Sequence, residues 1–407
     1  MPLALALAWA LAWALGCAAA PAAQAQPAAP ASAASAPAAS PAAALPAQPG
    51  LDAALNEAVL RVPSGGLTEP SLELTLFRPP GDGPFPVVVI NHGRAAGPAS
   101  LQARYRPLLA ARELVRRGYL VAVPMRQGFS QSGGGEISGG CNVHSNGLQQ
   151  ARSVRRTLDW LASQPYADVS RNAVFGQSHG GLTTLAYGTE PHPGTRLLVN
   201  FAGGLRQEAC LGWENNLARA MGDYGGATRL PSLWFYGDND SYFAPALWRA
   251  AFERYQQAGG RAELVAFGNF GNDAHAMFGA RAGLRIWLGP VLAAFTAAGL
   301  PVALVNPLPE PADLATPPAS GFARLDEVDK VPVRAERARD GYRQWLAADG
   351  PKAFAVHPVL GNWGASWGGN RANARALANC ERIAAERSAG QPCRLYAVDD
   401  SVVWVPQ

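Results

Sequence analysis

A serine stands between glycines in the stretch Gly176-Gln-Ser-His-Gly180, after a short apolar run (172–176) and before a helical pattern. The spacing is G-x-S-x-G, and it gains meaning from its place between a predicted strand and a predicted helix. A sharp turn there would hold the serine in a strained conformation. Glycines two residues away on each side would let the strand and the helix approach closely. We therefore predict that Ser178 is a nucleophile.

A serine hydroxyl needs a base to become a nucleophile, and the chain offers six histidines. His275 follows the last predicted strand in a Gly/Asn-rich stretch, "GNFGNDAHAMF", and is predicted to be the base. His179 adjoins the serine, and consecutive residues at such a turn point apart, so His179 cannot take the proton of Ser178. A carboxylate must orient the base. Asp238 and Asp240 both follow the predicted strand "SLWFY".

These residues need a scaffold that brings distant loops together. Short β-branched runs occur at 86–91, 118–124, 172–176, 196–204, 232–238 and 262–268. Helical patterns such as 101–118 and 147–164 alternate with them. Continuously apolar strands separated by amphipathic helices indicate a parallel sheet covered on both faces. The segment 71–81 alternates with period two and is predicted to enter this sheet antiparallel. The predicted fold class is α/β, with a doubly wound, mostly parallel sheet.

With these residues in this order, the region 51–300 resembles the α/β-hydrolase superfamily. In that superfamily the acid usually follows the glycine of G-x-x-D by three residues. After Gly237, the resemblance therefore selects Asp240 over Asp238. The stretch 120–134 resembles the Arg-Gly-x-x-x-Ser stretch of dienelactone-hydrolase-like and prolyl-oligopeptidase-like members. The superfold hosts many chemistries, so the resemblance implies the fold and the triad and leaves the substrate open.

The resemblance also implies an oxyanion hole. The stretch "VVVINHG" (87–93) resembles the strand and His-Gly loop that carry one oxyanion donor in these hydrolases. It implies that the backbone N–H of Arg94, or of Gly93, pairs with the backbone N–H of His179 to hold the developing negative charge. His92 would then shape the loop and carry no proton.

The chain opens on an apolar stretch, "MPLALALAWALAWALGC", with the length of a secretory signal and too short for a good membrane span. Residues 1–25 are therefore predicted to be a signal peptide. Alternatively, "ALGC" loosely resembles a lipobox, and lipidation of Cys17 would anchor the chain to a membrane. Both routes predict an exported protein, periplasmic or secreted. An Ala/Pro-rich linker (26–50) follows, and a second Pro-rich linker (301–335) precedes a small α+β domain (336–407).

Four cysteines remain once Cys17 is removed or lipidated: Cys141, Cys210, Cys380 and Cys393. An even number in an oxidising compartment indicates two disulfides, and the sequence alone allows three pairings. Cys141–Cys210 together with Cys380–Cys393 is the predicted pairing because it keeps each bridge within one domain. The C-terminal block is similar to a small cysteine-containing domain of unknown function found in exported bacterial proteins.

The segment 203–230 is long for a connection between two strands of this fold. Insertions at this place commonly form a lid over the nucleophile. Trp213 and Tyr224 would then either line an apolar acyl pocket or pack the lid onto the domain.

These patterns predict an exported serine hydrolase that cleaves carboxylic esters, with a small-molecule ester or peptide-like substrate. The net charge of +4 comes with no basic run, which argues against nucleic acid as a partner. No His/Asp/Glu cluster has ligand spacing, so neither a metal nor another cofactor is expected. One alternative is a serine peptidase of the prolyl-oligopeptidase-like type, which usually carries a large domain before the hydrolase; residues 51–70 leave no space for one. The other is a non-catalytic surface binding protein, a kind that typically loses triad members.

Overall fold

The computed structural model describes residues 50–66, 68–138, 140–308, 317–348, 351–367, 372–385 and 392–406. The predicted signal peptide (1–25), Cys17 and all but the last residue of the predicted linker 26–50 lie outside these ranges. Within them, no helix is both long and apolar enough to cross a membrane.

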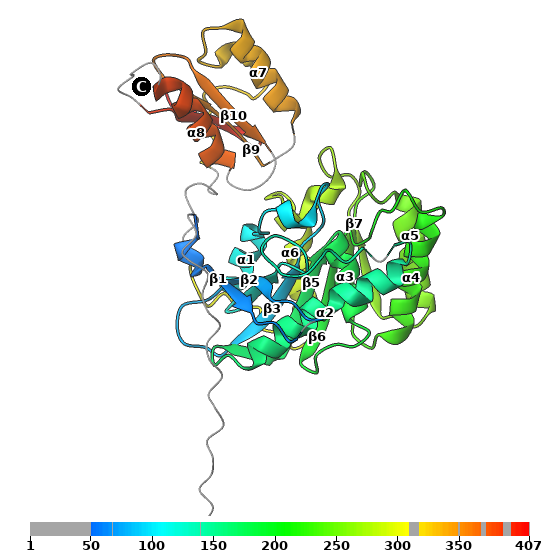
Figure 1. Cartoon of the computed structure of the whole chain (residues 1–407). Helices are drawn as coiled ribbons and strands as arrows, with labels where there is room; N and C mark the ends of the chain where they lie inside the picture. Colours follow the sequence, from blue (N-terminus) through cyan, green and yellow to red (C-terminus); the bar gives the residue numbers. More distant parts are fainter. Residues whose placement is uncertain are drawn as a thin grey trace, which may run out of the picture. The chain divides into compact units, whose positions relative to one another are not determined.

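A sheet of eight strands forms the large domain (Figure 1), in the spatial order β1-β2-β4-β3-β5-β6-β7-β8. The strands are β1 (Ala58–Val62), β2 (Leu72–Phe77), β3 (Phe85–Asn91), β4 (Leu120–Pro124), β5 (Ala167–Gln177), β6 (Thr195–Phe201), β7 (Ser232–Tyr236) and β8 (Ala262–Ala266). β2 pairs antiparallel with β1 and with β4, and all the other pairs are parallel. The predicted doubly wound, mostly parallel sheet is confirmed, and β2 is its antiparallel entry.

Helices cover both faces of this sheet. They are α1 (Leu108–Val115), α2 (Val143–Ala162), α3 (His179–Tyr187), α4 (Trp213–Ala227), α5 (Pro245–Gln257) and α6 (Leu284–Ala297), with short 3-10 helices at Ala53–Leu55, Ala99–Leu101 and Ala274–Gly279. Helices α2 to α5 pack into one buried cluster, and α1 and α6 pack into another. Val87 and Val89 of β3 face the first cluster, whereas Val88 and Ile90 face the second. Because both faces are buried, the strand is apolar at successive positions.

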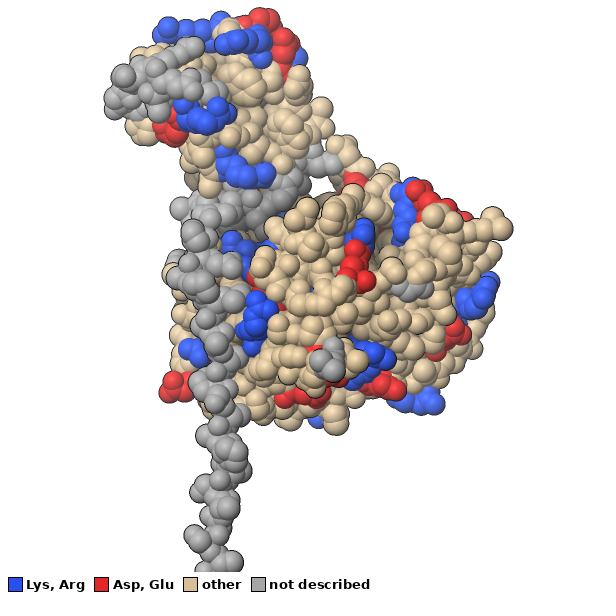
Figure 2. Space-filling model, viewed as in Figure 1, with Lys and Arg blue, Asp and Glu red and all other residues tan. Residues whose placement is uncertain are grey.

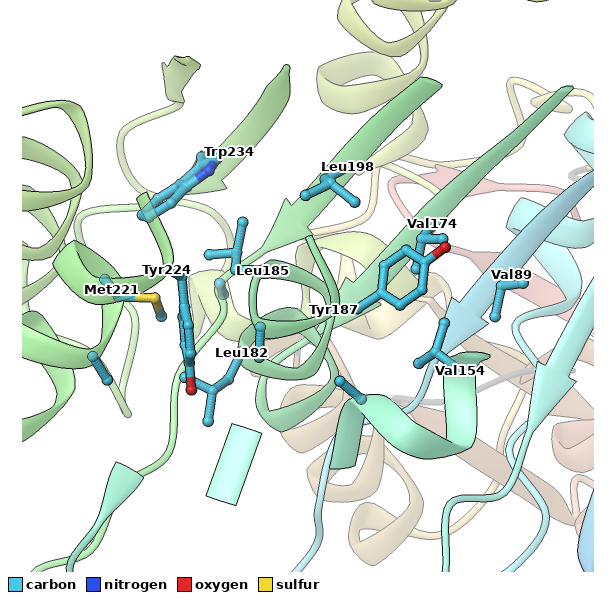
Figure 3. Close-up of a cluster of buried hydrophobic side chains, with 14 of the residues drawn as sticks. Val89, Val154, Val174, Leu182, Leu185, Tyr187, Leu198, Met221, Tyr224 and Trp234 are labelled. Atoms are coloured by element: carbon cyan, nitrogen blue, oxygen red, sulfur yellow. The ribbon is translucent and has the colours of Figure 1, made fainter. Parts of the chain in front are cut away.

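The segment 203–230 supplies α4, which belongs to the helical layer. Figure 3 shows Tyr224 of α4 among the side chains of the first cluster. Tyr224 is fully buried, and its hydroxyl donates to the carbonyl of His144 at 2.8 Å. Trp213 is partly buried and packs against the same cluster. Of the two predicted roles for these side chains, packing onto the domain is the one the structure shows.

A separate antiparallel sheet forms the C-terminal domain, with the strand order β10-β9-β11-β12. Its elements are the 3-10 helix Val328–Lys330, α7 (Glu336–Ala347), β9 (Lys352–Val356), β10 (Trp363–Trp367), α8 (Ala372–Ala385), β11 (Arg394–Val398) and β12 (Ser401–Val402). β11 and β12 form an antiparallel hairpin. Val331 and Val333 pack into the same core as Tyr342 of α7, so this core includes residues before the predicted boundary at 336.

Charged side chains on the face shown in Figure 2 are scattered, with basic and acidic groups next to one another. Ion pairs of the large domain include Arg171–Asp168 at 2.9 Å and Arg249–Asp238 at 3.0 Å. Proteins that bind nucleic acid usually concentrate lysine and arginine in a patch or stripe. This face carries no such concentration.

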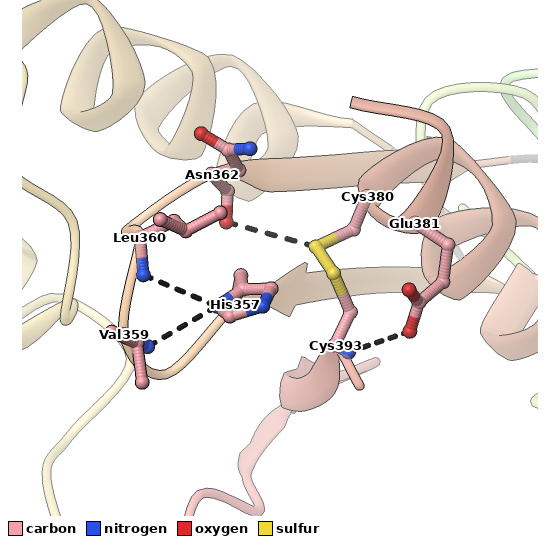
Figure 4. Close-up of a disulfide and its surroundings, with 7 residues drawn as sticks. All are labelled: His357, Val359, Leu360, Asn362, Cys380, Glu381 and Cys393. Carbon is pink, nitrogen blue, oxygen red and sulfur yellow. Dashed lines mark hydrogen bonds between the residues drawn. A yellow bond between two sulfur atoms is a disulfide. The ribbon is translucent and has the colours of Figure 1, made fainter. Parts of the chain in front are cut away.

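The structure contains both disulfides of the predicted pairing. Cys141 is joined to Cys210 and Cys380 to Cys393, with Cα–Cα distances of 5.6 and 6.1 Å. Figure 4 shows the second bridge, where Glu381 of α8 accepts a hydrogen bond from the backbone N–H of Cys393. Two disulfides are typical of a chain that matures in an oxidising compartment.

Reduction of the disulfides is expected to unfold the C-terminal domain while the large domain stays folded. The Cys380–Cys393 bridge joins residues 13 apart. A bridge closing a loop of this size stabilises a domain by about 3 kcal/mol, mainly by restricting the unfolded chain. That is a large share of the stability of a domain of about 70 residues. Scanning calorimetry with and without dithiothreitol should show one transition disappear and the other persist.

Two double variants are the controls for this prediction. Cys380→Ala/Cys393→Ala should abolish the reductant-sensitive transition without any reductant, whereas Cys141→Ala/Cys210→Ala should retain it. Four free thiols in air-oxidised protein, measured by alkylation and mass spectrometry, would contradict the bridges themselves.

Candidate active site

Ser178 occupies a sharp turn between β5 and α3. Its backbone has φ 56° and ψ −124°, a conformation that residues other than glycine rarely adopt. The flanking glycines make the turn possible. A Cβ on Gly176 would overlap the carbonyl of Gly180, and a Cβ on Gly180 would overlap the carbonyl of Asn91 at the end of β3. The strained turn therefore presents Ser178 at the carboxyl edge of the sheet.

Asp240 and His275 are brought together from loops 35 residues apart in the chain. Both carboxylate oxygens of Asp240 lie within hydrogen-bonding distance of His275 Nδ1, at 3.0 and 3.1 Å. The carboxylate is fixed by its own loop, because Oδ1 also accepts the backbone N–H groups of Tyr242 and Phe243 at 2.8 and 3.0 Å. The side chain of Asp240 is wholly buried and that of His275 is 11% exposed. A buried carboxylate held in this way can orient an imidazole.

Two side chains hydrogen-bond the backbone of His275 and connect it to the serine turn and to the loop of Asp240. The side-chain amide of Gln177, the residue before the serine, donates to the carbonyl of His275 at 2.9 Å. Asp273 accepts the N–H of His275 at 2.9 Å and also bonds the backbone and the hydroxyl of Ser241. Burial raises the pKa of Asp273, but these hydrogen bonds outweigh it and the pKa is lowered. Asp273 therefore links the loops of acid and base, and the sequence did not indicate this role.

Asp238, the other carboxylate considered, faces solvent. Its side chain is 44% exposed and pairs with Arg249 at 3.0 Å. The ring of Tyr242 lies beside the imidazole of His275, with centroids 4.4 Å apart and the ring planes tilted by 31°. The structure thus places Asp240, and not Asp238, against His275.

The two predicted oxyanion segments lie beside Ser178. A Cβ built on Gly93 would be 3.3 Å from the Cβ of Ser178, so the loop after β3 runs against the serine. His179 is the first residue of α3, and the first N–H groups of a helix have no partner within the helix. These N–H groups are suited to negative charge. The side chain of Arg94 is paired with Glu136 at 2.6 Å, and the predicted oxyanion donor is the backbone N–H of Arg94.

The side chains of His92 and His179 are both buried. Burial holds the pKa of each imidazole well below its ordinary value, and the charge of Arg126 acts in the same direction. Both rings are therefore neutral near pH 7. Among the described residues, no group of three or more His, Cys, Asp and Glu side chains is arranged to hold a metal ion.

Comparison with known proteins gives a partial family match. The family model of the X-Pro dipeptidyl-peptidases (S15 family) matches residues 70–241. No curated protein matches the chain. A putative dienelactone hydrolase from Klebsiella pneumoniae is 20% identical with a TM-score of 0.44, covering 59% of this chain and 98% of its own. An esterase from Pyrococcus furiosus is 14% identical with a TM-score of 0.44, and the match covers 63% of this chain and 95% of the esterase. An acylaminoacyl peptidase from Pyrococcus horikoshii is 17% identical with a TM-score of 0.45, and the match covers 59% of this chain and 41% of the peptidase.

The family match spans the strands from β2 to the end of β7, including the turn at Ser178 and the loop that ends at Asp240. It includes the five neighbouring parallel strands β4, β3, β5, β6 and β7, and it ends before β8 and His275. Strand order, serine turn and family match together place the chain in the α/β-hydrolase superfamily of serine hydrolases.

Proposed function

We propose that this protein hydrolyses carboxylic esters, with Ser178 as nucleophile, His275 as base and then acid, and Asp240 as the orienting carboxylate. The approach of Asp240 to His275 Nδ1, at 3.0 and 3.1 Å, is the observation that carries the proposal. A carboxylate can only accept, so Nδ1 carries the proton and Nε2 keeps its lone pair. That lone pair is what a serine hydroxyl needs.

The reaction has two halves. Ser178 Oγ attacks the ester carbonyl while His275 Nε2 takes its proton, and the carbonyl oxygen becomes an oxyanion. The intermediate collapses, the bond to the alcohol oxygen breaks, and His275 gives the proton to the departing alcohol. Water then attacks the acyl-enzyme with His275 again as base. The free acid leaves, and the proton returns to Ser178 Oγ.

The oxyanion is stabilised by backbone donors in this proposal. The N–H groups of Arg94 and His179 belong to the two segments that lie against Ser178. Fixed donors of this kind are suited to a charge that develops only in the transition state.

Peptide hydrolysis is the second candidate function, favoured by the match to the S15 family model. A peptidase that removes dipeptides must hold the substrate's terminal ammonium, usually through an unpaired carboxylate. Glu136 contacts the loop beside the serine, but Arg94 already neutralises it. Glu208, in the segment after β6, is paired with Arg206. Because both carboxylates are already paired with arginine, neither is free to hold a substrate ammonium, and we infer a preference for uncharged ester substrates.

A substrate panel decides between these candidates. We expect p-nitrophenyl acetate and butyrate to be hydrolysed with a kcat/KM at least tenfold above that of Gly-Pro-p-nitroanilide. The reverse order would make the protein a peptidase. Failure to turn over any of these substrates, together with failure to react with a fluorophosphonate probe, would leave a non-catalytic binding protein. We further propose that the protein acts outside the cytoplasm, supported by its two disulfides.

A further inference from the structure

Arg126 follows β4 and is completely buried. It donates from Nε to Gln150 at 3.0 Å, from Nη1 to the backbone carbonyl of His92, and from Nη2 toward His179 Nδ1 at 3.4 Å. Its guanidinium also lies over the ring of Phe129, 5.2 Å from the centroid. One side chain therefore contacts both segments that carry the proposed oxyanion donors.

The bonds around His92 determine which of its nitrogens is protonated. Nε2 accepts the backbone N–H of Arg126 at 3.0 Å, so the proton must be on Nδ1. Nδ1 lies 2.7 Å from the carbonyl oxygen of Gly93 and donates to it. In a trans peptide the carbonyl and the next N–H point in opposite directions. By holding the carbonyl of Gly93, His92 directs the N–H of Arg94 to the other side of the peptide plane.

His179 is fixed by the same logic. Arginine can only donate, so His179 Nδ1 is the acceptor from Arg126 and the proton is on Nε2. Nε2 donates to Asn146 Oδ1 at 2.8 Å, and the amide of Asn146 donates in turn to the carbonyls of Ile137 and Ser138. The ring of His179 is thereby anchored away from Ser178. Its backbone N–H stays at the start of α3.

The charge of Arg126 is not balanced by a bound carboxylate. In the described part of the chain its hydrogen-bond partners are an amide, a backbone carbonyl and an imidazole, all uncharged. Burial lowers the pKa of the guanidinium, and the more distant charge of Glu136 raises it. Burying a cation against neutral partners lowers the free energy of unfolding, so the fold by itself gains nothing from this arrangement. An anion that forms nearby during turnover would offset that cost.

We propose that Arg126 is a positioning residue that holds both oxyanion donors in place and favours the negatively charged transition state. This inference rests on the proposed ester hydrolysis. Arg126 acts on the donors through His92 and His179 and touches neither the acid nor the base of the triad.

Arg126→Met tests the proposal in the full-length protein. We expect kcat for p-nitrophenyl butyrate to fall about 10²-fold or more, the scale of losing an oxyanion donor, with KM within threefold. Affinity for a trifluoromethyl ketone, which forms a tetrahedral oxyanion on the serine, should fall in parallel. Arg126→Lys should recover part of both, because it keeps the charge and some of the hydrogen bonds. A residue that only supports the fold would change the melting temperature without changing inhibitor affinity relative to KM.

Arg117→Met is the matched control. Arg117 is also buried, but it pairs with Glu113 at 2.7 Å in and just after α1, outside the proposed active site. The Arg117→Met variant should have a lower melting temperature and unchanged kcat and inhibitor affinity. The inference would be overturned if the Arg126→Met variant kept both its kcat and its inhibitor affinity. Wild-type protein without esterase activity or fluorophosphonate labelling would instead overturn the proposed function.

Two substitutions of His92 test the proposal without removing Arg126. In His92→Asn the amide nitrogen stands near the place of Nδ1 and can still donate to Gly93. In His92→Gln the amide oxygen reaches the place of Nε2 and can accept the backbone N–H of Arg126, but no donor stands at the place of Nδ1 beside Gly93. We expect the asparagine variant to retain at least tenfold more kcat. Equal or reversed activities would show that the bond to Gly93 does not direct the donor.

Discussion

Replacing Ser178 with alanine is expected to lower ester turnover by about 10⁴-fold or more and leave the fold intact. The loss follows from removal of the attacking oxygen, and triad serines in other enzymes show losses on this scale. The fold should survive because the turn is held by main-chain bonds. The N–H of Ser178 donates to the carbonyl of Phe201 at 2.9 Å, and its carbonyl accepts from Gly204 at 3.0 Å. Alanine keeps both bonds and has the same Cβ.

The measurement is kcat/KM for p-nitrophenyl butyrate, with circular dichroism to check the fold. Labelling by a fluorophosphonate should disappear in Ser178→Ala. Ser163→Ala is the control: this serine lies on the surface just after α2, where its hydroxyl donates to the carbonyl of Trp160 and accepts from the side-chain amide of Gln164. It should match the wild type in rate and in labelling. Near-normal turnover by Ser178→Ala would mean that another residue is the nucleophile.

The sequence was sufficient to predict the sheet because its central strands are buried on both faces. Such strands are continuously apolar, and 86–91 within β3 shows this pattern clearly. β1 was not predicted, since its five residues include Arg61 and only Val59 and Val62 are buried. A short edge strand with so few buried apolar residues does not stand out in the sequence.

Chain order predicted that the loop with Asp238 and Asp240 lies near His275, because parallel strands place their carboxyl ends on one edge of the sheet. The choice of Asp240, the residue that contacts His275, came from the resemblance to the superfamily. The network around Arg126 could not be predicted in the same way. Its partners Gln150 and His179 are 24 and 53 residues away. These contacts depend on how α2 and α3 pack against the carboxyl ends of the strands. The spacing of apolar residues in the sequence does not predict that packing. The same holds for Tyr224, whose burial follows from the position of α4.

Asp240→Asn is expected to lower kcat/KM by about 10⁴-fold, the scale seen when the orienting carboxylate of a triad becomes an amide. In Asp240 the oxygen Oδ1 accepts two backbone N–H groups, from Tyr242 and Phe243. An asparagine must keep its oxygen there, so its NH₂ group turns toward His275. A donor facing Nδ1 requires Nδ1 to accept, which moves the imidazole proton to Nε2. Nε2 can then no longer take the proton of Ser178.

Asp238→Asn is the matched control, because it changes the same kind of group two residues away. Asp238 is 44% exposed, and its pair with Arg249 is a surface ion pair that contributes little to stability. The kcat/KM of the Asp238→Asn variant should stay within about threefold of the wild-type value. The reason is that Asp238 does not contact His275 and so does not set the tautomer of its imidazole. NMR of the imidazole nitrogens should show the proton move from Nδ1 to Nε2 only in Asp240→Asn. If Asp238→Asn loses more activity than Asp240→Asn, the orienting acid is Asp238 and the loop must rearrange when substrate binds.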